Sequence, residues 1–524
     1  MRCDSAPYSS KRFHTNRNRL FLSILILLLA SLACDLSNPT PASWALTPTA
    51  LAQAASATAN AATQAAAVVP LVSLTPVPSI APPTATPQPT ALSPAGPWLV
   101  YPSEGGQALV VRNVDGSAAM RVVIPPLLYA TDLTRGLSPA GGVLVFRTGL
   151  RSQPAETALY LLSLPDGQLK RLTPLFSESE QAMIQAGTDT RAADTAVGVM
   201  RADSLAWSPD GRYLAFIAAL DRNASDLYLY DTQASQTTRM TFGPNMYATP
   251  FWSSNSQSVM TQEVVSFNAG STAQAWKLGD VWLTDVKTGA SAKMYTPPPE
   301  SVGEVFTGWE TDSSLLTYSR SAAGGISLRL IELKPFKSTT LLSGPFDALV
   351  FDPASRVVAF IHKQSGSGSD LLANGLYLLA PDSLDPRLVQ AGEWQGLYWS
   401  VNGAEFMASG PQGVIGVTPD GTAGLISGEV QLSPSPQGNW LAGWGGSSLN
   451  GQPGLRLYRN GGALVQQVVS DAVQQMIWQP DAKGLFFISG SRLELAVFPA
   501  LQPVILDPDL KPGATPVLVW MTAG

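Results

Sequence analysis

The apolar residues of this chain fall into short runs separated by turns, and one combination of run and turn recurs. Its clearest copy is Ser204–Phe216 (SLAWSPDGRYLAF), in which an apolar strand ends at Trp207 and a Ser-Pro-Asp-Gly turn leads into a second apolar strand. In such a turn Pro sets φ at the first corner, Asp bonds its own backbone and Gly takes a positive φ. The two strands are therefore expected to form a hairpin.

Eight copies of this unit can be marked by the last apolar residue before each turn. The markers are Leu137, Trp207, Trp252, Trp309, Phe351, Trp399, Leu432 and Trp478. Most neighbouring markers are 33 to 57 residues apart by subtraction, which suits four strands per unit. A unit of this size cannot bury its own apolar faces, so the copies must stack. The pattern predicts an all-β fold, a β-propeller of four-stranded antiparallel blades; we expect eight, and seven to nine fit the spacing.

The remaining strands of each unit can also be read from the sequence. A third, apolar strand follows each hairpin, as in DLYLYD from Asp226, and a fourth, more polar strand follows it, as in TTRMT from Thr237. The polarity of the fourth strand fits an outer edge with one exposed side. Apolar runs at Pro97 and at Pro516 belong to no complete unit. Pairing them within one blade would close the ring and remove free edges.

Two copies carry enough detail to resemble a known family. Ser204–Phe216 and the following Asp226–Val259 (DLYLYDTQASQTTRMTFGPNMYATPFWSSNSQSV) resemble the repeat of the TolB-type propeller. The resemblance implies a TolB-like propeller over most of Pro97–Gly524. WD40-like repeat proteins share that architecture, but their Gly-His and Trp-Asp signatures are absent here. We interpret the Trp residues as wedges that pack between blades.

The first 33 residues have the pattern of an export signal. Five basic residues precede the uncharged run Leu20–Ala33, which is about 14 residues long and short for a membrane span. The run ends in Ser-Leu-Ala followed by Cys34, which resembles a bacterial lipoprotein processing site. The resemblance implies cleavage before Cys34 and lipidation of its thiol. An ordinary cleaved signal peptide with an incidental Cys is the alternative.

Residues 34–96 are expected to form a lipidated N-terminus and a disordered stalk. This stretch is rich in Ala, Thr, Pro and Ser and nearly without charge, so it cannot bury enough surface to offset its ordering entropy. The predicted organisation is therefore signal peptide (1–33), stalk (34–96) and β-propeller (97–524). We expect an exported protein anchored by lipid to the outer side of the bacterial cytoplasmic membrane or to an outer membrane.

Composition narrows the candidate functions. Charged residues make up 13% of the chain and the net charge is -6, so no basic patch for nucleic acid is expected. Only two His are present, His14 and His362, and no metal site or other cofactor is predicted. The carboxylate pairs Asp203 with Asp210 and Glu178 with Glu180 are interpreted as turn aspartates and a solvated acidic loop. The sequence therefore predicts that the protein is not an enzyme.

Loop lengths indicate one face of the propeller as the binding face. In a four-stranded meander, the connections from second to third strand and from blade to blade lie on one rim, which we call the loop rim; the other connections lie on the turn rim. The long connections all belong to the loop rim: Arg147–Thr157, Thr173–Ala202, Glu263–Gly279, His362–Asn374 and Gly445–Pro453. The binding residues predicted there are Arg151, Glu178, Glu180, Phe267, Trp276, His362 and Lys363.

The leading hypothesis is a cell-envelope lipoprotein whose propeller is a non-catalytic scaffold. Its loop rim is expected to bind a protein, a peptide or an envelope polymer, because a rigid scaffold presents adaptable loops where recognition occurs. The alternative is a propeller-type glycan-active enzyme, either a lyase or a hydrolase. Tolerated insertions without a binding role would also explain the long loops.

Overall fold

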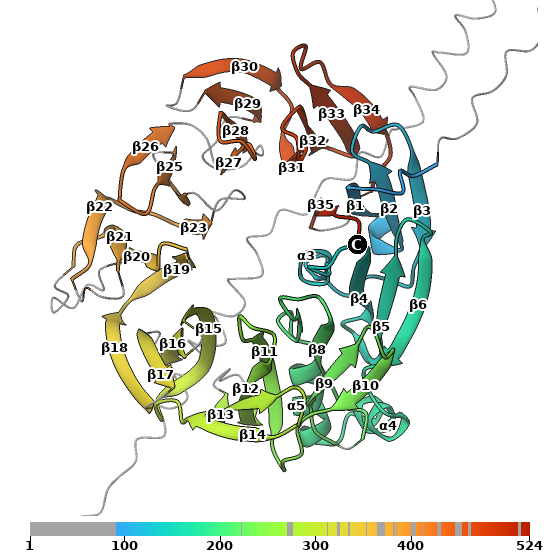
Figure 1. The fold of residues 1–524 in the computed structure, drawn as a ribbon, viewed down its shortest axis with the longest axis vertical. Coiled ribbons are helices and arrows are strands. Elements are labelled where there is room, and N and C mark those ends of the chain that lie inside the picture. Colours follow the sequence, from blue (N-terminus) through green and yellow to red (C-terminus); the bar gives the residue numbers. More distant parts are fainter. Residues whose placement is uncertain are drawn as a thin grey trace, which may run out of the picture. The chain divides into compact units, whose positions relative to one another are not determined.

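The fold of the repeat region is a nine-bladed β-propeller. The computed structural model describes residues 91–524 except 222, 270–275, 312, 322–324, 334–335, 353, 364–371, 381–382, 384, 400–404, 412, 427–430, 446–452, 460–462 and 512–514. Eight sheets have four strands and one has three, and every pairing between consecutive strands within a blade is antiparallel. The blades follow one another around a ring in chain order (Figure 1). The predicted all-β propeller is confirmed, and nine lies at the upper limit of the expected count.

The first three blades take their strands from residues 98–239, except for the innermost strand of blade 1, which comes from residues 519–521. Blade 1 contains β35 (Val519–Met521), β1 (Trp98–Ser103), β2 (Ala108–Asn113) and β3 (Ala119–Val123). Blade 2 contains β4 (Val143–Leu150), β5 (Gln153–Ser163) and β6 (Gln168–Pro174), and an isolated bridge between Leu137 and Leu144 stands in place of its innermost strand. Blade 3 contains β7 (Leu205–Trp207), β8 (Tyr213–Ala218), β9 (Asp226–Asp231) and β10 (Gln236–Arg239).

The next three blades repeat the same meander. Blade 4 contains β11 (Met246–Trp252), β12 (Ser258–Ser266), β13 (Lys277–Asp285) and β14 (Ser291–Tyr295). Blade 5 contains β15 (Ser301–Thr311), β16 (Ser314–Ser321), β17 (Ile326–Leu333) and β18 (Phe336–Gly344). Blade 6 contains β19 (Phe346–Asp352), β20 (Val357–His362), β21 (Gly375–Leu379) and β22 (Arg387–Ala391).

The last three blades complete the ring. Blade 7 contains β23 (Gly396–Trp399), β24 (Phe406–Gly410), β25 (Gly413–Val417) and β26 (Ala423–Ile426). Blade 8 contains β27 (Gln431–Pro434), β28 (Trp440–Gly445), β29 (Gly454–Arg459) and β30 (Leu464–Val469). Blade 9 contains β31 (Val473–Trp478), β32 (Gly484–Ser489), β33 (Arg492–Val497) and β34 (Val504–Asp507).

The two ends of the propeller meet in blade 1. Strand β35 pairs antiparallel with β1, in the register Trp98 with Met521 and Val100 with Val519, and the two strands lie side by side in Figure 1. The apolar runs at Pro97 and Pro516, which belonged to no complete unit in the sequence, therefore share a blade. This is the pairing that was expected to close the ring. The two runs supply the ninth blade that the eight turn markers did not count.

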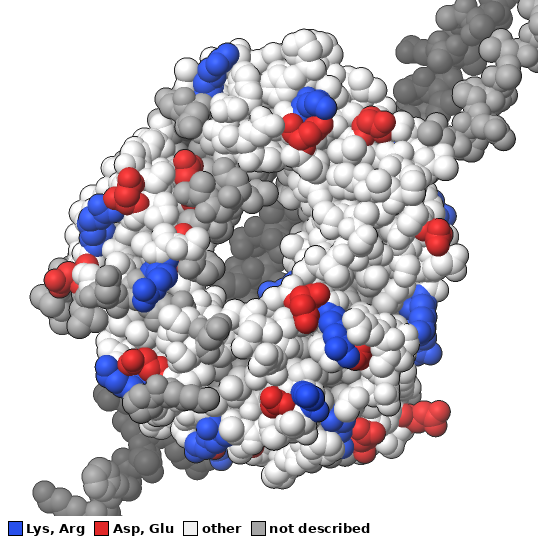
Figure 2. Space-filling model, viewed as in Figure 1, with Lys and Arg blue, Asp and Glu red and all other residues white. Residues whose placement is uncertain are grey.

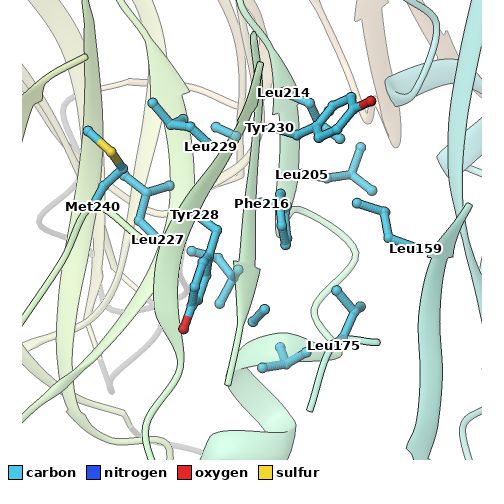
Figure 3. Packing of buried hydrophobic residues seen from close by; sticks show 14 of the residues in the cluster. Leu159, Leu175, Leu205, Leu214, Phe216, Leu227, Tyr228, Leu229, Tyr230 and Met240 are labelled. Atoms are coloured by element: carbon cyan, nitrogen blue, oxygen red, sulfur yellow. The ribbon is translucent and has the colours of Figure 1, made fainter. Parts of the chain in front are cut away.

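Apolar packing between neighbouring blades forms the core. Between blades 2 and 3, Leu159 of β5 packs in one buried cluster with Leu205, Leu214 and Phe216 of β7 and β8 (Figure 3). Such residues face a neighbouring sheet on each side, which explains why the inner strands read as nearly continuous apolar runs. At about 25 cal/mol per Å² of apolar surface buried, these interfaces are the main favourable term for the fold.

Tryptophan side chains link successive blades by hydrogen bonds as well as by packing. The indole Nε1 donates to a backbone carbonyl of the preceding blade or of the connection leading into it: Trp207 to Gly136, Trp252 to Ala206, Trp309 to Trp252, Trp478 to Ser433 and Trp520 to Trp478, at 2.6–3.0 Å. The interpretation of these residues as wedges between blades is confirmed. The bonds also satisfy carbonyl groups that face the interface.

Two helices lie in the connection between blades 2 and 3, where the sequence analysis expected a loop. They are α4 (Glu178–Ala186), which Ser177 caps through a bond from the Glu180 amide, and α5 (Thr190–Val199), which Asp189 caps. A short helix α3 (Asp132–Arg135) joins blades 1 and 2. Among the described residues, no helix is long and apolar enough to cross a membrane. The predicted signal peptide, Cys34 and the stalk up to residue 90 lie outside the described residues.

Candidate functional site

The loop rim carries two neighbouring cavities, on either side of the segment that leads from α5 into β7. The first cavity has a volume of about 580 Å³ and is lined by Arg201, Phe267, Trp276, Glu304 and Arg320, among others. These residues come from the α5–β7 segment, the β12–β13 connection and the loop-rim ends of β15 and β16. Four parts of the chain, from blades 4 and 5 and from the connection between blades 2 and 3, therefore build one site.

Arg201 and Trp276 form the most distinctive contact of the first cavity. The guanidinium carbon of Arg201 lies 4.2 Å from the centre of a Trp276 ring, which is a favourable cation–π distance. Arg201 also forms an ion pair with Asp203. Its Nε and the Oδ1 of Asp203 are buried without a hydrogen-bond partner. Polar atoms left unpaired in this way are unusual in a folded protein and occur at functional sites.

The Trp276 ring is supported from below by a packed aromatic side chain. Phe267 meets it edge to face at 5.1 Å between ring centres and is only 3% exposed. Asp194 of α5 fixes this loop by accepting bonds from the Phe267 amide at 3.1 Å and the Ala269 amide at 2.7 Å. A side chain at Gly198 would come within 2.9 Å of the Phe267 ring, so glycine is required for this approach. The helix thus positions the aromatic wall of the cavity.

Blade 5 contributes a buried carboxylate to the cavity wall. The Oε1 of Glu304 accepts bonds from Arg329 and Thr317, each at 2.6 Å, and from the Tyr295 hydroxyl at 3.0 Å. Its Oε2 accepts one bond from Ser319, at 2.7 Å. Burial, followed by the negative charge of Glu304, raises the pKa of Tyr295 well above its usual value, so the phenol keeps its proton. The network holds Glu304 in one orientation.

The second cavity lies on the other side of the α5–β7 segment. It has a volume of about 410 Å³, and its lining includes Tyr129, Thr131, Arg151 and Ala202. The guanidinium carbon of Arg151 lies 4.3 Å from the centre of the Tyr129 ring. The Tyr129 hydroxyl donates to the Met200 carbonyl at 2.5 Å. Arg151 is therefore held above a fixed aromatic ring at the surface.

A buried ion pair holds the segment between the two cavities. Arg147 of β4 and Asp132 of α3 have side chains 1% and 0% exposed, and two parallel bonds of 2.9 and 2.7 Å join them. The same guanidinium donates to the Arg201 carbonyl and to the Ser204 hydroxyl, both at 2.6 Å. A fully paired guanidinium of this kind fixes the backbone on which Arg201 stands.

Three of the seven predicted binding residues lie at these cavities. Phe267 and Trp276 are brought together in the first cavity, and Arg151 lines the second. Glu178, Glu180, His362 and Lys363 line neither of them. Glu178 is exposed in the first turn of α4, and Lys363 is partly buried just after β20.

Two expectations about exposure are wrong. Glu180 does not lie in a solvated acidic loop: its side chain is 0% exposed on α4, and both carboxylate oxygens lack a hydrogen-bond partner. Burial and the nearby Asp189 raise the pKa of Glu180 to about 7. His362 is not a rim residue that could contact a ligand, because it is 3% exposed and packs against Phe346 and Tyr377.

The sequence analysis missed the charged residues that distinguish the site. Arg201, Glu304 and Arg320 were not singled out. Glu304 and Arg320 lie on paired strands of blade 5, but Arg201 comes from the connection between blades 2 and 3 and joins them only when the blades stack. One signal was readable: charges are scarce in this chain, so a charge at the loop-rim end of an inner strand was informative. On the face drawn in Figure 2, charged side chains are sparse and lie mostly around the outer circumference.

The carboxylate pairs considered from the sequence do not converge. Asp203 lies beside Arg201 on the loop rim, whereas Asp210 lies in the β7–β8 turn and accepts from the Ser208 hydroxyl and the Arg212 amide. Within the described part of the chain, no group of three or more His, Cys, Asp or Glu side chains is placed to hold a metal ion. Glu304 is an acidic residue in the lining of the first cavity, and its side chain is 0% exposed.

Comparisons with known proteins support the fold and point toward an enzyme. No family model matches the chain. It is 35% identical over 63 residues to the uncharacterized peptidase YuxL of Bacillus subtilis (strain 168), a match that covers 12% of this chain and spans about a tenth (10%) of the length of that relative.

Solved structures with a similar fold include several propeller proteins. The crystal structure of a eukaryotic initiation factor is 12% identical, with a TM-score of 0.50 over 80% of this chain and 98% of that one. Oligogalacturonate lyase from Vibrio parahaemolyticus is 13% identical (TM-score 0.36, 60% and 88% covered), and TolB from Acinetobacter baumannii is 13% identical (TM-score 0.30, 55% and 62% covered). At such low identity these likenesses show a shared fold alone.

The prediction that the protein is not an enzyme is contradicted by the curated match, because that relative is a peptidase. The sequence analysis searched for catalytic groups close together in the sequence, whereas the charged residues of the first cavity come from blade 5 and from the connection between blades 2 and 3. The similar structures also include dipeptidyl peptidase 4 of Porphyromonas gingivalis, which is 12% identical (TM-score 0.43, 74% and 64% covered) and shows the fold alone.

Proposed function

We propose that the protein is a propeller-type glycan-active enzyme, a lyase or a hydrolase, whose first cavity binds an acidic sugar. The observation that carries the proposal is the combination of two guanidinium groups, Arg201 and Arg320, with the Trp276 indole in one cavity of about 580 Å³. Arginine forks match the geometry of a carboxylate, and an indole face offers an apolar plate for the C–H face of a sugar ring.

The charge of the cavity favours an anionic ligand. Arg320 is exposed beside Tyr318, at 5.7 Å, and has no carboxylate partner among the described residues. Arg201 is paired with Asp203 on one side only, and its Nε stays unpaired. Glu304 is neutralised by Arg329. A uronic acid supplies the carboxylate that these two guanidinium groups can bind.

Glu304 lines the cavity, but its side chain is 0% exposed and its Oε2 accepts a bond from Ser319, so it fixes the cavity wall and does not reach the substrate. In a lyase reaction, a base takes the proton from the carbon next to the uronate carboxylate, and the electrons of that bond form a C=C double bond. The neighbouring C–O bond breaks, and the departing oxygen takes up that proton. Arg201 and Arg320 stabilise the charge that develops on the carboxylate.

The proposal is tested by incubating the protein with oligogalacturonate and analysing the products by mass spectrometry. A lyase yields one fragment with an unsaturated end, whereas a hydrolase adds water to the broken bond. We expect Arg320→Gln to lower kcat/KM about tenfold, because a hydrogen bond to a charged group is worth about 1.5–3 kcal/mol.

Arg212→Gln is the matched control for this experiment. Arg212 is also partly exposed and also lies over a tyrosine ring, that of Tyr213 at 4.7 Å, but it is on the turn rim. The Arg212→Gln substitution should leave kcat/KM unchanged. The proposal is contradicted if the unaltered protein neither binds nor cleaves oligogalacturonate. It is also contradicted if Arg320→Gln and Arg212→Gln change kcat/KM equally.

We also infer that the enzyme acts outside the cell, attached to a membrane by lipid at Cys34. Support comes from the sequence: a basic segment, an apolar run and a small residue before the Cys. Several acyl chains would give a stable anchor, because each buried CH₂ contributes about 0.8 kcal/mol. Fractionation of cells that express Cys34→Ser should move the protein out of the membrane fraction, and retention there would contradict the anchor.

A further inference from the structure

We propose that the second cavity is a further sugar subsite, so that the substrate is a polyuronate long enough to cross from one cavity to the other. This inference rests on the proposed function of the first cavity. Arg201 lines the first cavity and the next residue, Ala202, lines the second. Consecutive Cα atoms are about 3.8 Å apart, so a single ridge of backbone separates the two cavities.

Each cavity contains the same two chemical groups. In the first, the Arg201 guanidinium lies 4.2 Å from a Trp276 ring centre. In the second, the Arg151 guanidinium lies 4.3 Å from the Tyr129 ring centre. A polyuronate presents a sugar ring and a carboxylate in every residue. Each cavity offers an aromatic ring for the sugar and a guanidinium for the carboxylate, so the two cavities match this repeat.

The second cavity is a built site, because buried groups hold its aromatic ring. Tyr129 is fixed by its bond to the Met200 carbonyl and by the buried guanidinium of Arg147, 5.0 Å from its ring centre. Arg151 is exposed above that ring and has no carboxylate partner among the described residues. An unpaired guanidinium held in place in this way loses little side-chain entropy when it binds an anion.

The ridge between the cavities is compatible with an anionic chain. Backbone carbonyl oxygens would repel such a chain if they faced it. Here the carbonyls of Val199, Arg201 and Ala202 accept bonds from the buried Arg147 guanidinium, at 3.4, 2.6 and 3.5 Å. The dipoles of the ridge are therefore turned toward the interior of the propeller, away from the proposed ligand.

The test is the dependence of affinity on ligand length, measured by titration calorimetry with galacturonate oligomers of two and six residues. We expect the hexamer to bind about tenfold more tightly than the dimer, since a second pairing with a charged group is worth about that factor. Arg151→Gln should remove this gain and leave the affinity for the dimer unchanged. Arg320→Gln should weaken both oligomers, and Arg212→Gln should weaken neither.

The outcomes separate this inference from the proposed function. If the dimer and the hexamer bind equally, or if Arg151→Gln keeps the gain, the second subsite is wrong while the first cavity stands. If neither oligomer binds the unaltered protein, both proposals fall. Hexaglutamate tests the class of ligand: tighter binding of this peptide than of the hexagalacturonate would show that the cavities recognise an acidic peptide, and it would overturn the assignment to a glycan.

Discussion

Arg212 on the turn rim and two arginines on the loop rim lie beside tyrosine rings but differ in their partners. On the turn rim, Arg212 lies over the Tyr213 ring and also pairs with Asp231 at 2.9 Å. On the loop rim, Arg151 and Arg320 lie beside tyrosine rings in the same way, but neither has a carboxylate partner among the described residues. The same local arrangement is neutralised at Arg212 and left open at Arg151 and Arg320, whereas Arg147 and Arg201 of the loop rim are paired with aspartates. The comparison indicates that the charges of Arg151 and Arg320 are available to a ligand.

Acidic side chains occur in two kinds of environment. On the turn rim, Asp285 accepts bonds from the hydroxyl and the amide of Thr288, both at 2.7 Å, and these bonds lower its pKa. Asp420 is held in the same way, chiefly by the Thr418 hydroxyl, and its pKa is also lowered. In the connection on the loop rim, burial raises the pKa of Glu180 to about 7. The two aspartates stay ionised because hydrogen bonds within their turns stabilise the charged form, whereas Glu180 is buried without a hydrogen-bond partner.

The largest loss of stability is expected at the buried ion pair between Arg147 and Asp132 on the loop rim. Arg147→Met leaves Asp132 buried without its partner, which typically costs about 3–5 kcal/mol. Urea unfolding at pH 7 should show this loss, whereas Arg212→Gln should have a much smaller effect, because it breaks an exposed pair on the turn rim that solvent screens. Similar losses for the two variants would remove the energetic difference between the rims.

An intermediate effect is expected at Glu180, and it depends on pH. From about pH 4.5 to 7 the folded protein keeps a proton that the unfolded chain releases, so stability falls as the pH rises through this window. Glu180→Gln removes this dependence of stability on pH. The gain in unfolding free energy of the variant over the parent should therefore be about 1–2 kcal/mol larger at pH 8 than at pH 4. Thermal melting of both proteins at the two pH values measures this difference. A variant that melts lower than the parent at pH 8 would contradict the buried, unpaired state.

The smallest effect is expected at a turn-rim aspartate. Asp285→Asn removes a charge that accepts two bonds within its own turn and should cost less than about 1 kcal/mol at pH 7. Because the folded-state pKa is lowered, this contribution is present above about pH 4 and is lost as the pH falls further. Parent and variant should therefore converge in melting temperature near pH 3, and a difference that persists there would point to a packing effect.

Much of the fold could be predicted because its signals are local. The Ser-Pro-Asp-Gly turn after Trp207 gives a hairpin within about a dozen residues, and the repeat of that hairpin gives the architecture. The ninth blade was not counted because β1 and β35 lie at opposite ends of the propeller sequence. Only the closed ring brings them together. Helix α4 had a readable signal, Ser177 followed three residues later by Glu180, with Gly187 after its last turn.

The site was less predictable for a physical reason. Phe267 and Trp276 stood out as aromatic residues in a long loop, and they do form the wall of the first cavity. Glu304 and Arg320 lie on one hairpin of blade 5, but Arg201 joins them only through the stacking of the blades, which no local pattern encodes. His362 was misjudged because it ends a strand, yet β20 is buried along most of its length.

The pairing of β35 with β1 has a consequence for how the protein is made. A ribosome releases the chain from its amino end, so blade 1 lacks its innermost strand until Met521 has been synthesised. The ring therefore cannot close until β35 has been synthesised, however early the middle blades form. A mutation that stops synthesis before β35 leaves the edge of β1 exposed to other chains, and aggregation is the expected fate of such a fragment.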